Sequence, residues 1–216
     1  MSTTSNPLPR DFYDRDTVQV ARDLLGCTLH RQVAGTRYVA RVVETEAYVG
    51  PHDLACHASK GLTPRTEPMF GPPGHAYVYF IYGLHHCLNA VTEGPGSGSA
   101  VLIRAVEPIE GFAAADRTDG PARLTRVLSI DKASNKVDLT LGRDLWFEEA
   151  TERGEVSTGK RIGVDYAGEW AERPWRFWLD SPWVSVRPRA RPRGPRSRVL
   201  EGTPTRRFGR KGTRGL

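Results

Sequence analysis

The chain has 216 residues, 38% of them hydrophobic, a net charge of +6 and a mean hydropathy of −0.47, which suits a soluble domain with a sizeable core. No apolar run approaches the ~20 residues of a membrane helix, so a helical membrane protein is excluded and no membrane partner is expected. Residues 1–6 are polar and lack the apolar core of an export signal, so we expect a cytoplasmic protein.

The first predicted element is a helix over residues 16–25. Its apolar stripe consists of Val20, Ala21, Leu24 and Leu25. Either Asp14 or Asp16 can cap its start, and Gly26 suits its end.

Strand-like runs separated by turn residues follow this helix. They cover residues 27–33, 37–48, 76–81, 84–92 and 100–108. Residues 50–74 form a long, proline-rich connection, and such a connection is usually functional or ordered by the rest of the fold. A second helix starts at Gly120-Pro121 and runs to residue 128, and further strands are expected at 145–147, 161–163, 176–178 and 183–186.

Short strands that follow one another without alternating helices predict an antiparallel sheet. The expected fold class is α+β, a single mixed domain over residues 1–186 with a largely antiparallel curved sheet, flanking helices and a protruding β-hairpin. Residues 187–216 carry eleven Lys or Arg and one acidic residue among many prolines and glycines, which predicts a disordered basic tail. This tail either tethers a polyanion or is a solvated extension, and composition does not separate the two.

The three cysteines, Cys27, Cys56 and Cys87, are widely spaced and odd in number. This pattern argues against a disulfide framework and fits a reducing compartment. Without a C-x-x-C pair, the sequence offers neither a zinc knuckle nor a four-cysteine iron–sulfur cluster.

The aromatic run Tyr77-Val-Tyr-Phe-Ile-Tyr-Gly83 predicts a β-ribbon with a turn at Tyr82-Gly83. If Val78 and Phe80 sit in the core, Tyr77 and Tyr79 face a cleft, and Tyr82 projects from the tip. A projecting aromatic side chain can enter a base step of DNA. Tyrosines also commonly fill β-sheets, and for any single one of them this simpler interpretation is favoured.

The run Val43-Glu-Thr-Glu-Ala-Tyr48 alternates, so Glu44, Glu46 and Tyr48 share one face of a strand. Strand interiors are poor in Glu, so such a carboxylate is either exposed at an edge or held for acid–base work. N-Glycosidic hydrolysis passes through an oxocarbenium-like sugar. One carboxylate can both stabilise that cation and take a proton from the attacking water. The residues alone do not choose between Glu44 and Glu46.

His52 and His57 follow Glu46, but their spacing matches no common zinc pattern, and we expect no metal and no cofactor. A pocket histidine that hydrogen-bonds a base is favoured, with a buried structural histidine as the alternative. No lysine occurs between Leu29 and Lys60. This stretch therefore supplies no amine for a Schiff base, which favours direct hydrolysis by water.

Several sequence blocks resemble, in one order, the alkyladenine (3-methyladenine, or methylpurine) DNA glycosylase family, and the resemblance covers most of the chain before residue 186. The strongest blocks are Val43-Glu-Thr-Glu-Ala-Tyr-Val-Gly-Pro51, Thr63-Pro-Arg65, Met69-Phe70, Tyr77-Val-Tyr-Phe-Ile-Tyr-Gly83, Leu102-Ile-Arg-Ala-Val-Glu-Pro108 and Ala167-Gly-Glu-Trp170. The resemblance implies a monofunctional glycosylase of base excision repair that flips alkylated or deaminated purines and hydrolyses their N-glycosidic bond with a Glu-activated water. It implies double-stranded DNA with damaged purines as the partner, a monomer, and association with the nucleoid if the source is bacterial.

The resemblance also implies roles for residues of the base pocket. Glu46 is similar to the general base, and Arg104 to the arginine that helps to hold the water. Tyr48 and Tyr79 are similar to the two aromatic plates around the flipped base, with His57 at its edge. Asn89 is similar to the asparagine that clashes with the exocyclic amine of guanine.

For DNA contacts, the resemblance implies an intercalating role for Tyr82 and phosphate contact in the block that holds Ser181. Leu84, two residues after Tyr82, is also expected to contact DNA. The chain departs from vertebrate members here, with Leu84 in place of a methionine and His85-His86 in place of an aromatic pair.

Two other functions stay open at this point. One is a catalytically inactive lesion- or nucleic-acid-binding module of the same fold, against which the joint presence of Glu46, His57, Tyr79 and Asn89 speaks. The other is a hydrolase of a different N-glycoside, such as a free nucleoside, for which the projecting hairpin and the basic tail would have no use.

Overall fold

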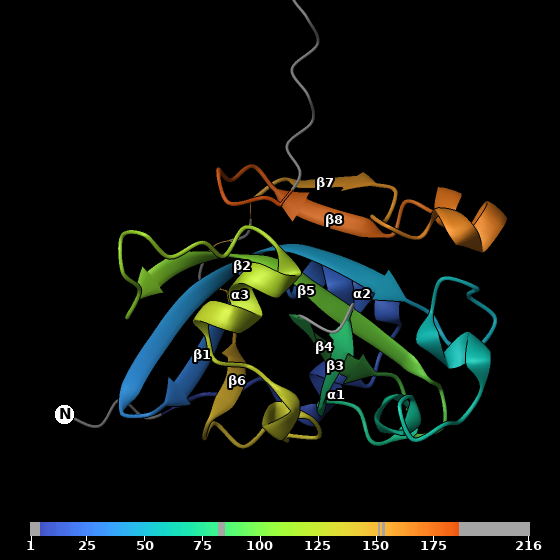
Figure 1. The fold of residues 1–216 in the computed structure, drawn as a ribbon, viewed down its shortest axis with the longest axis horizontal. Coiled ribbons are helices and arrows are strands. Elements are labelled where there is room, and N and C mark those ends of the chain that lie inside the picture. Colours follow the sequence, from blue (N-terminus) through green and yellow to red (C-terminus); the bar gives the residue numbers. More distant parts are fainter. Residues whose placement is uncertain (1–4, 82–84, 151, 153, 186–216) are drawn as a thin grey trace, which may run out of the picture. The chain divides into compact units, whose positions relative to one another are not determined.

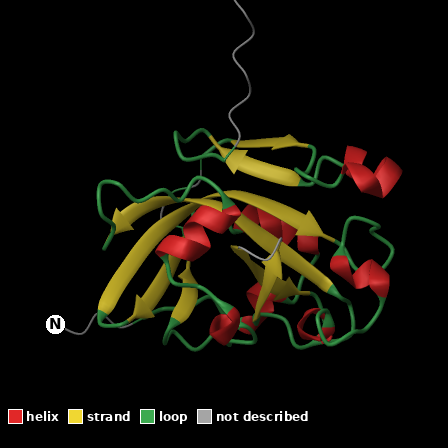
Figure 2. Ribbon diagram, viewed as in Figure 1, coloured by secondary structure: helices red, strands yellow, loops and turns green. Residues whose placement is uncertain are grey.

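The computed structural model describes residues 5–81, 85–150, 152 and 154–185 (Figure 1). Within these ranges eight strands form one curled antiparallel sheet with the order β3-β4-β5-β2-β1-β6, in which β8 also pairs with β2, and β7 with β8. The strands are β1 (Thr28–Val33), β2 (Thr36–Tyr48), β3 (Ala76–Ile81), β4 (His85–Thr92), β5 (Ser99–Glu110), β6 (Leu145–Glu148), β7 (Val156–Gly159) and β8 (Arg176–Leu179). The predicted α+β class is confirmed (Figure 2).

Short helices accompany the sheet. They are α1 (Arg10–Tyr13), α2 (Thr17–Asp23) and α3 (Pro121–Val127), with the 3-10 helices η1 (His57–Lys60), η2 (Glu67–Phe70), η3 (Lys132–Ser134) and η4 (Asp165–Glu172). Helix α2 packs against β2 and β5, and α3 packs against β4 and β5. Within the described residues, none of the helices combines the length and the apolar composition that a membrane span requires.

Helix α2 begins where the sequence predicts because Asp16 caps it. The Asp16 carboxylate accepts the backbone N–H of Gln19 at 2.9 Å, which satisfies one of the free donors of the first turn. The helix ends at Asp23, two residues earlier than predicted, and Gly26 then adopts a φ of +86°. This left-handed conformation favours glycine and turns the chain into β1.

Two predicted strands are wrong. Residues 161–163 form a bend rather than a strand, and the strand lies earlier, at β7. Residues 183–185 also form no strand, and residue 186 lies outside the described residues. In both segments a backbone N–H donates to a side-chain carboxylate and not to the carbonyl of a neighbouring strand. The N–H of Ile162 donates to Glu46, and the N–H of Ser185 donates to Glu44.

The hairpin of β3 and β4 forms as predicted, but its faces differ in part from the expectation. Val78 is buried, whereas Phe80 is 50% exposed. The Phe80 ring packs on His86, its cross-strand partner, with ring centroids 4.9 Å apart. Phe80 therefore gains a local cross-strand contact rather than a place in the core. The tip, with Tyr82 and Leu84, lies outside the described residues.

Strand β2 positions the candidate site. Its second half pairs with β5 on one edge and with β8 on the other. Glu44 and Glu46 are consequently fully buried, which excludes the edge-exposed alternative for both. The β2–β5 register skips Val43 on one strand and Arg104 on the other, and such irregularities re-aim side chains.

Candidate active site

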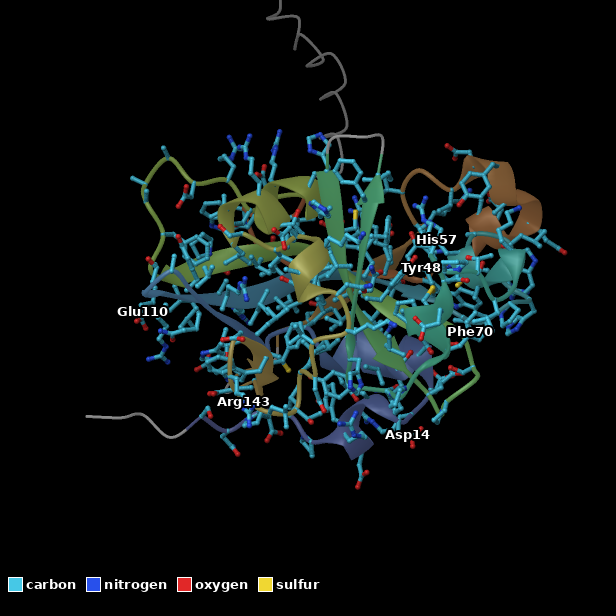
Figure 3. All side chains as sticks on the ribbon, turned by 60° about the horizontal axis from the view of Figure 1, so that its bottom comes forward. Asp14, Tyr48, His57, Phe70, Glu110 and Arg143 are labelled. Atoms are coloured by element: carbon cyan, nitrogen blue, oxygen red, sulfur yellow. The ribbon has the colours of Figure 1, made fainter. Side chains whose placement is uncertain are left out.

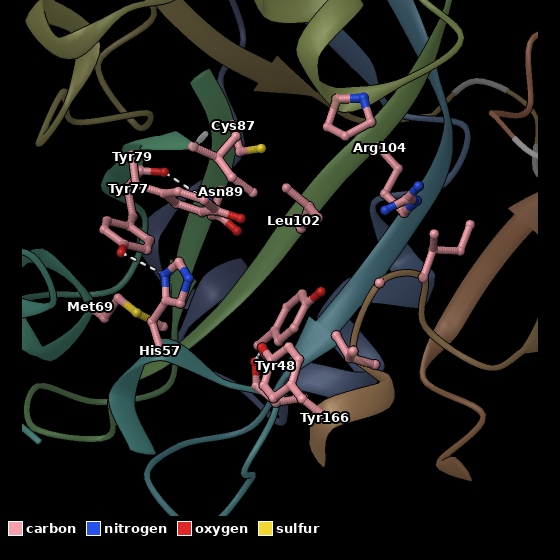
Figure 4. Close-up of a pocket in the computed structure, with 16 residues that line it drawn as sticks. Tyr48, His57, Met69, Tyr77, Tyr79, Cys87, Asn89, Leu102, Arg104 and Tyr166 are labelled. Carbon is pink, nitrogen blue, oxygen red and sulfur yellow. Dashed lines mark hydrogen bonds between the residues drawn. The ribbon is translucent and has the colours of Figure 1, made fainter. Parts of the chain in front are cut away.

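A pocket of about 270 Å³ lies between the β3–β4 hairpin, the end of β2 and the loop over residues 162–166 (Figure 4). This volume is near the lower end of the ~300–1,000 Å³ of typical small-molecule sites. It therefore suits one planar ring system better than a large ligand.

Aromatic side chains form two walls of this pocket. Tyr79 and His57 form one wall, with ring centroids 4.5 Å apart. Tyr48 forms the opposite wall, and Tyr166 lies beside it (Figure 4). Figure 3 labels Tyr48 and His57 on the same side of the molecule, away from Glu110 and Arg143. A planar, electron-poor ring can stack between such walls.

The His57 wall is uncharged near neutral pH. Its Nδ1 is 2.9 Å from the Tyr77 hydroxyl. Burial, assisted by the nearby positive charge of Arg65, lowers the pKa of His57 to about 4. Burial also raises the pKa of Tyr77 to about 12, so this hydroxyl keeps its proton.

Sheet pairing fixes the inner end of the pocket. Asn89 is 3% exposed, and its Nδ2 donates to the carbonyl oxygen of Tyr77 at 2.9 Å. It pairs with Tyr77 on β3 and with Leu102 on β5. The amide is therefore held in one orientation by the sheet.

Glu46 lies behind the Tyr48 wall and not in the pocket itself. Its Oε1 accepts the backbone N–H of Ile162 at 2.8 Å, and its Oε2 accepts the Tyr48 hydroxyl at 2.8 Å. Arg104 Nη1 lies 3.3 Å from Oε1. The pocket is lined by these three neighbours, while the Glu46 side chain is fully buried. The resemblance implies that Glu46 activates the water behind the flipped nucleotide, and in this structure the carboxylate meets the pocket only through Tyr48, Ile162 and Arg104.

Glu44 has a different set of partners from Glu46. It accepts Arg104 Nε at 3.0 Å, Arg176 Nε at 2.7 Å and the backbone N–H of Ser185 at 2.7 Å. These contacts hold Arg104 between the two glutamates.

The two carboxylates differ in acidity as a result. Burial raises the pKa of Glu46 above its ordinary value, although Arg104 and the two hydrogen bonds oppose it. Burial acts in the same direction on Glu44, but Arg104, Ser185 and Arg176 outweigh it, so its pKa is lowered. Glu44 thus remains an anion that holds Arg104, and Glu46 binds a proton more readily.

The structure brings most predicted site residues together. Those at or directly behind the pocket are Glu46, Tyr48, His57, Tyr79, Asn89 and Arg104. Ser181 lies elsewhere: its Oγ contacts Glu107 at 3.5 Å and accepts the backbone N–H of Trp183 at 3.2 Å. Tyr82 and Leu84 are outside the described residues, so their DNA contacts stay predictions.

Sequence reasoning missed several residues of the site. They are Met69, Cys87, Leu102 and Tyr166 in the pocket, and Asp53 and Arg161 behind it. Strand alternation could have identified two of them, because Cys87 shares a face with Asn89, and Leu102 with Arg104. Tyr166 and Arg161 belong to segments without such a period.

The sequence model of the family described as "Methylpurine-DNA glycosylase (MPG)" matches residues 11–182. The chain belongs to this family. Family membership makes it a DNA glycosylase, an enzyme that hydrolyses N-glycosyl bonds.

Relatives with the name "Putative 3-methyladenine DNA glycosylase" match most of the chain. The protein from Myxococcus xanthus is 56% identical and the match covers 85% of this chain and 95% of the relative. The one from Methanocella arvoryzae is 52% identical over 83% and 96% of the two chains. The one from Legionella pneumophila (strain Corby) is 50% identical over 82% and 97%.

Proposed function

We propose that the protein removes alkylated or deaminated purines from double-stranded DNA by flipping the damaged nucleotide into the aromatic pocket and hydrolysing its N-glycosidic bond with a water that Glu46 activates. The observation that carries this proposal is the slot between Tyr48 and Tyr79, which lies directly beside the buried Glu46–Arg104 pair.

The pocket chemistry suits a damaged purine. Alkylated purines are cationic or electron-poor, so stacking on Tyr48 and Tyr79 gains cation–π attraction. The neutral His57 ring adds no repulsive charge. A damaged pair also takes less energy to open, which favours such bases before the chemical step.

Hydrolysis needs a group that accepts one proton. The water oxygen attacks the anomeric carbon, the N-glycosidic electron pair leaves with the base, and Glu46 takes the water proton. The raised pKa of Glu46 suits this role near neutral pH. Arg104 stabilises the carboxylate before the proton arrives.

This mechanism requires that a water molecule reaches the buried Glu46 carboxylate. Glu46 Oε1 already meets the Ile162 N–H and, at 3.3 Å, Arg104 Nη1, so the capacity for a further hydrogen bond lies on Oε2, beside the Tyr48 hydroxyl. The side chain has no exposed surface in the described conformation. The water must therefore reach Oε2 past the Tyr48 hydroxyl when the nucleotide binds, and catalytic contacts commonly tighten only in that complex.

Glu46→Gln tests the proposal on a duplex with one 1,N6-ethenoadenine. We expect single-turnover excision at enzyme excess to fall by about 10²- to 10⁴-fold, the usual contribution of a general base, while lesion affinity persists. Glu110→Gln is the matched control, since Glu110 lies at the far end of β5, away from Tyr48 and His57 (Figure 3).

Other outcomes point to other functions. If Glu46→Gln excises the lesion at the wild-type rate, Glu46 is not the general base. If the variant loses both lesion binding and excision, Glu46 is a structural residue. Lesion binding without excision by the wild-type protein would indicate an inactive binding module. Hydrolysis of free nucleosides in the absence of DNA would indicate a different N-glycoside hydrolase.

A further inference from the structure

Arg161 and Asp53 form an ion pair behind the aromatic pocket, and both side chains are fully buried. The guanidinium meets the carboxylate in a two-point contact: Nη2 donates to Oδ1 at 2.8 Å, and Nη1 donates to Oδ2. Burial lowers the pKa of Arg161, but the hydrogen bonds and charge of Asp53 outweigh it and raise the pKa. The pair is therefore charged and has a fixed planar geometry.

Asp53 holds the connection between β2 and η1. Its two oxygens accept the backbone N–H groups of Val49 at 3.2 Å and Ala55 at 3.0 Å. Ala55 lines the pocket, and His57 follows two residues later. The carboxylate thus sets the path of the chain from the Tyr48 wall to the His57 wall.

Arg161 holds Tyr48 from the protein side. The guanidinium carbon lies 4.9 Å from the centroid of the Tyr48 ring, and the fully buried Arg161 side chain does not line the pocket, whereas Tyr48 does. Nη1 donates to the carbonyl of Ala47 at 2.9 Å, and Nη2 to that of Trp170 at 3.0 Å. A cation on the rear face fixes the ring plane and leaves the front face for a base.

The same loop reaches the proposed general base. Ile162 follows Arg161 and donates its backbone N–H to Glu46 Oε1 at 2.8 Å. A shift of the guanidinium would therefore shift a donor that lowers the pKa of Glu46. The other titratable or charged groups that act on Glu46 are Glu44 and Tyr48 on β2, Tyr79 on β3, Cys87 on β4, Arg104 on β5 and Arg161 itself.

A buried ion pair is a poor device for stability alone. Desolvation of both charges offsets most of their attraction, and apolar residues of similar volume often stabilise a fold as well. Apolar residues cannot supply directional contacts to four backbone groups and to one face of an aromatic ring. The Arg161–Asp53 pair makes these backbone and ring contacts next to the pocket, which indicates that it shapes the pocket.

We propose that the Arg161–Asp53 pair is a positioning element for base excision: it sets the Tyr48 ring, the loop that carries His57 and, if the proposed role of Glu46 holds, the amide that orients the general base.

Two conservative substitutions test this role. Arg161→Lys keeps the positive charge and loses the two-point contact, and Asp53→Asn keeps an acceptor oxygen and loses the charge. For each variant, single-turnover excision of 1,N6-ethenoadenine and affinity for the same duplex are measured across a range of pH. We expect excision to slow by about 10- to 100-fold, as a small misplacement can cause, and lesion binding to weaken. The acid limb of the pH–rate profile should move to higher pH, because a weakened Ile162 contact raises the pKa of Glu46.

Lys160→Met is the matched control, because it removes an exposed ion pair with Glu172 from the same loop. Its rate, affinity and pH profile should equal those of the wild type. Wild-type behaviour of the folded Arg161→Lys and Asp53→Asn proteins would overturn the proposal. So would a lower rate with unchanged affinity and an unchanged pH profile, which a smaller folded fraction would produce. Failure of both variants to fold would make the pair a folding element instead.

Glu46→Gln in the same assay separates this proposal from the proposed function. If Glu46→Gln is inactive and both pair variants behave as wild type, only the positioning role fails. If Glu46→Gln is fully active, Glu46 is not the general base. The lesion affinity of Arg161→Lys then tests whether the ion pair positions Tyr48 and His57. Weaker affinity supports positioning of Tyr48 and His57, and unchanged affinity overturns it.

Discussion

His57 combines a place in the pocket wall with a ring that is neutral at pH 7, because burial and Arg65 lower its pKa to about 4. Its contact with the Tyr77 hydroxyl holds the ring against Tyr79. A protonated imidazole at this position would repel a cationic alkylpurine, so the burial that lowers the pKa also keeps the pocket suited to such a base.

This pKa predicts how acid affects stability. Between pH ~6.5 and about 4, the unfolded chain binds a proton at His57 that the folded protein does not bind, so the free energy of unfolding falls as the pH falls through this window. His57→Gln lacks this group. The Tm advantage of the wild type over His57→Gln should therefore shrink as the pH is lowered through the window, as followed by thermal unfolding. A constant Tm difference across it would contradict the lowered pKa.

At the scale of elements, irregular pairing between β2 and β5 decides the geometry of the ion cluster. The register skips Val43 and Arg104, and Arg104 then reaches both Glu44 at 3.0 Å and Glu46 at 3.3 Å. Regular alternation predicts that the two glutamates share a face, which their common contact with Arg104 bears out. Where Val43 and Arg104 leave the regular pairing depends on how β2 pairs with β5 and β8 together. The sequence of β2 alone therefore does not reveal these irregularities.

The close approach of Gly98, just before β5, to η1 and η2 makes a testable prediction at the scale of elements. Gly98 has a φ of +72°, and a Cβ there would lie 2.9 Å from Ala58, beside His57, and from the Phe70 ring. Gly98→Ala therefore adds an overpacking cost of about 1–3 kcal/mol to the left-handed strain of about 1–2 kcal/mol.

Gly35→Ala is the matched control for this substitution, since Gly35 has a φ of +79° and no atom within 4 Å of its added Cβ. Denaturant unfolding should show a clearly larger loss of stability for Gly98→Ala. Equal losses would mean that η1 and η2 move aside without cost.

At the scale of the whole molecule, charge is distributed unevenly. The net charge of +6 arises because residues 187–216 hold eleven basic residues and one acidic residue, while the preceding residues hold 20 basic and 24 acidic ones. A DNA glycosylase must approach a polyanion, and these preceding residues are slightly acidic overall. The basic residues after 186 are therefore the candidates for long-range attraction.

Truncation after Val186 tests this interpretation and keeps the contact of Ser185 with Glu44. If the removed residues bind phosphates, the slope of log Kd against log salt concentration should become shallower on undamaged duplex, with lesion excision at saturating enzyme unchanged. The measurement is a salt titration of DNA affinity for both proteins. An unchanged slope would assign residues 187–216 to a solvated extension.

The sequence by itself determined the fold class, most strand positions and the residue types of the pocket, because these depend on local periodicity, capping and turn residues that act within a few positions. The strand lies at Val156–Gly159 and not at residues 161–163, and Phe80 is exposed and not in the core. Both differences from the prediction depend on partners that are distant in sequence. The tertiary structure alone decided that Glu46 lies behind Tyr48 and that Arg161 and Asp53 meet. Buried charges are placed by the partners that compensate their desolvation, and here two of those partners, Arg161 for Asp53 and the Ile162 amide for Glu46, lie more than a hundred residues away in the sequence.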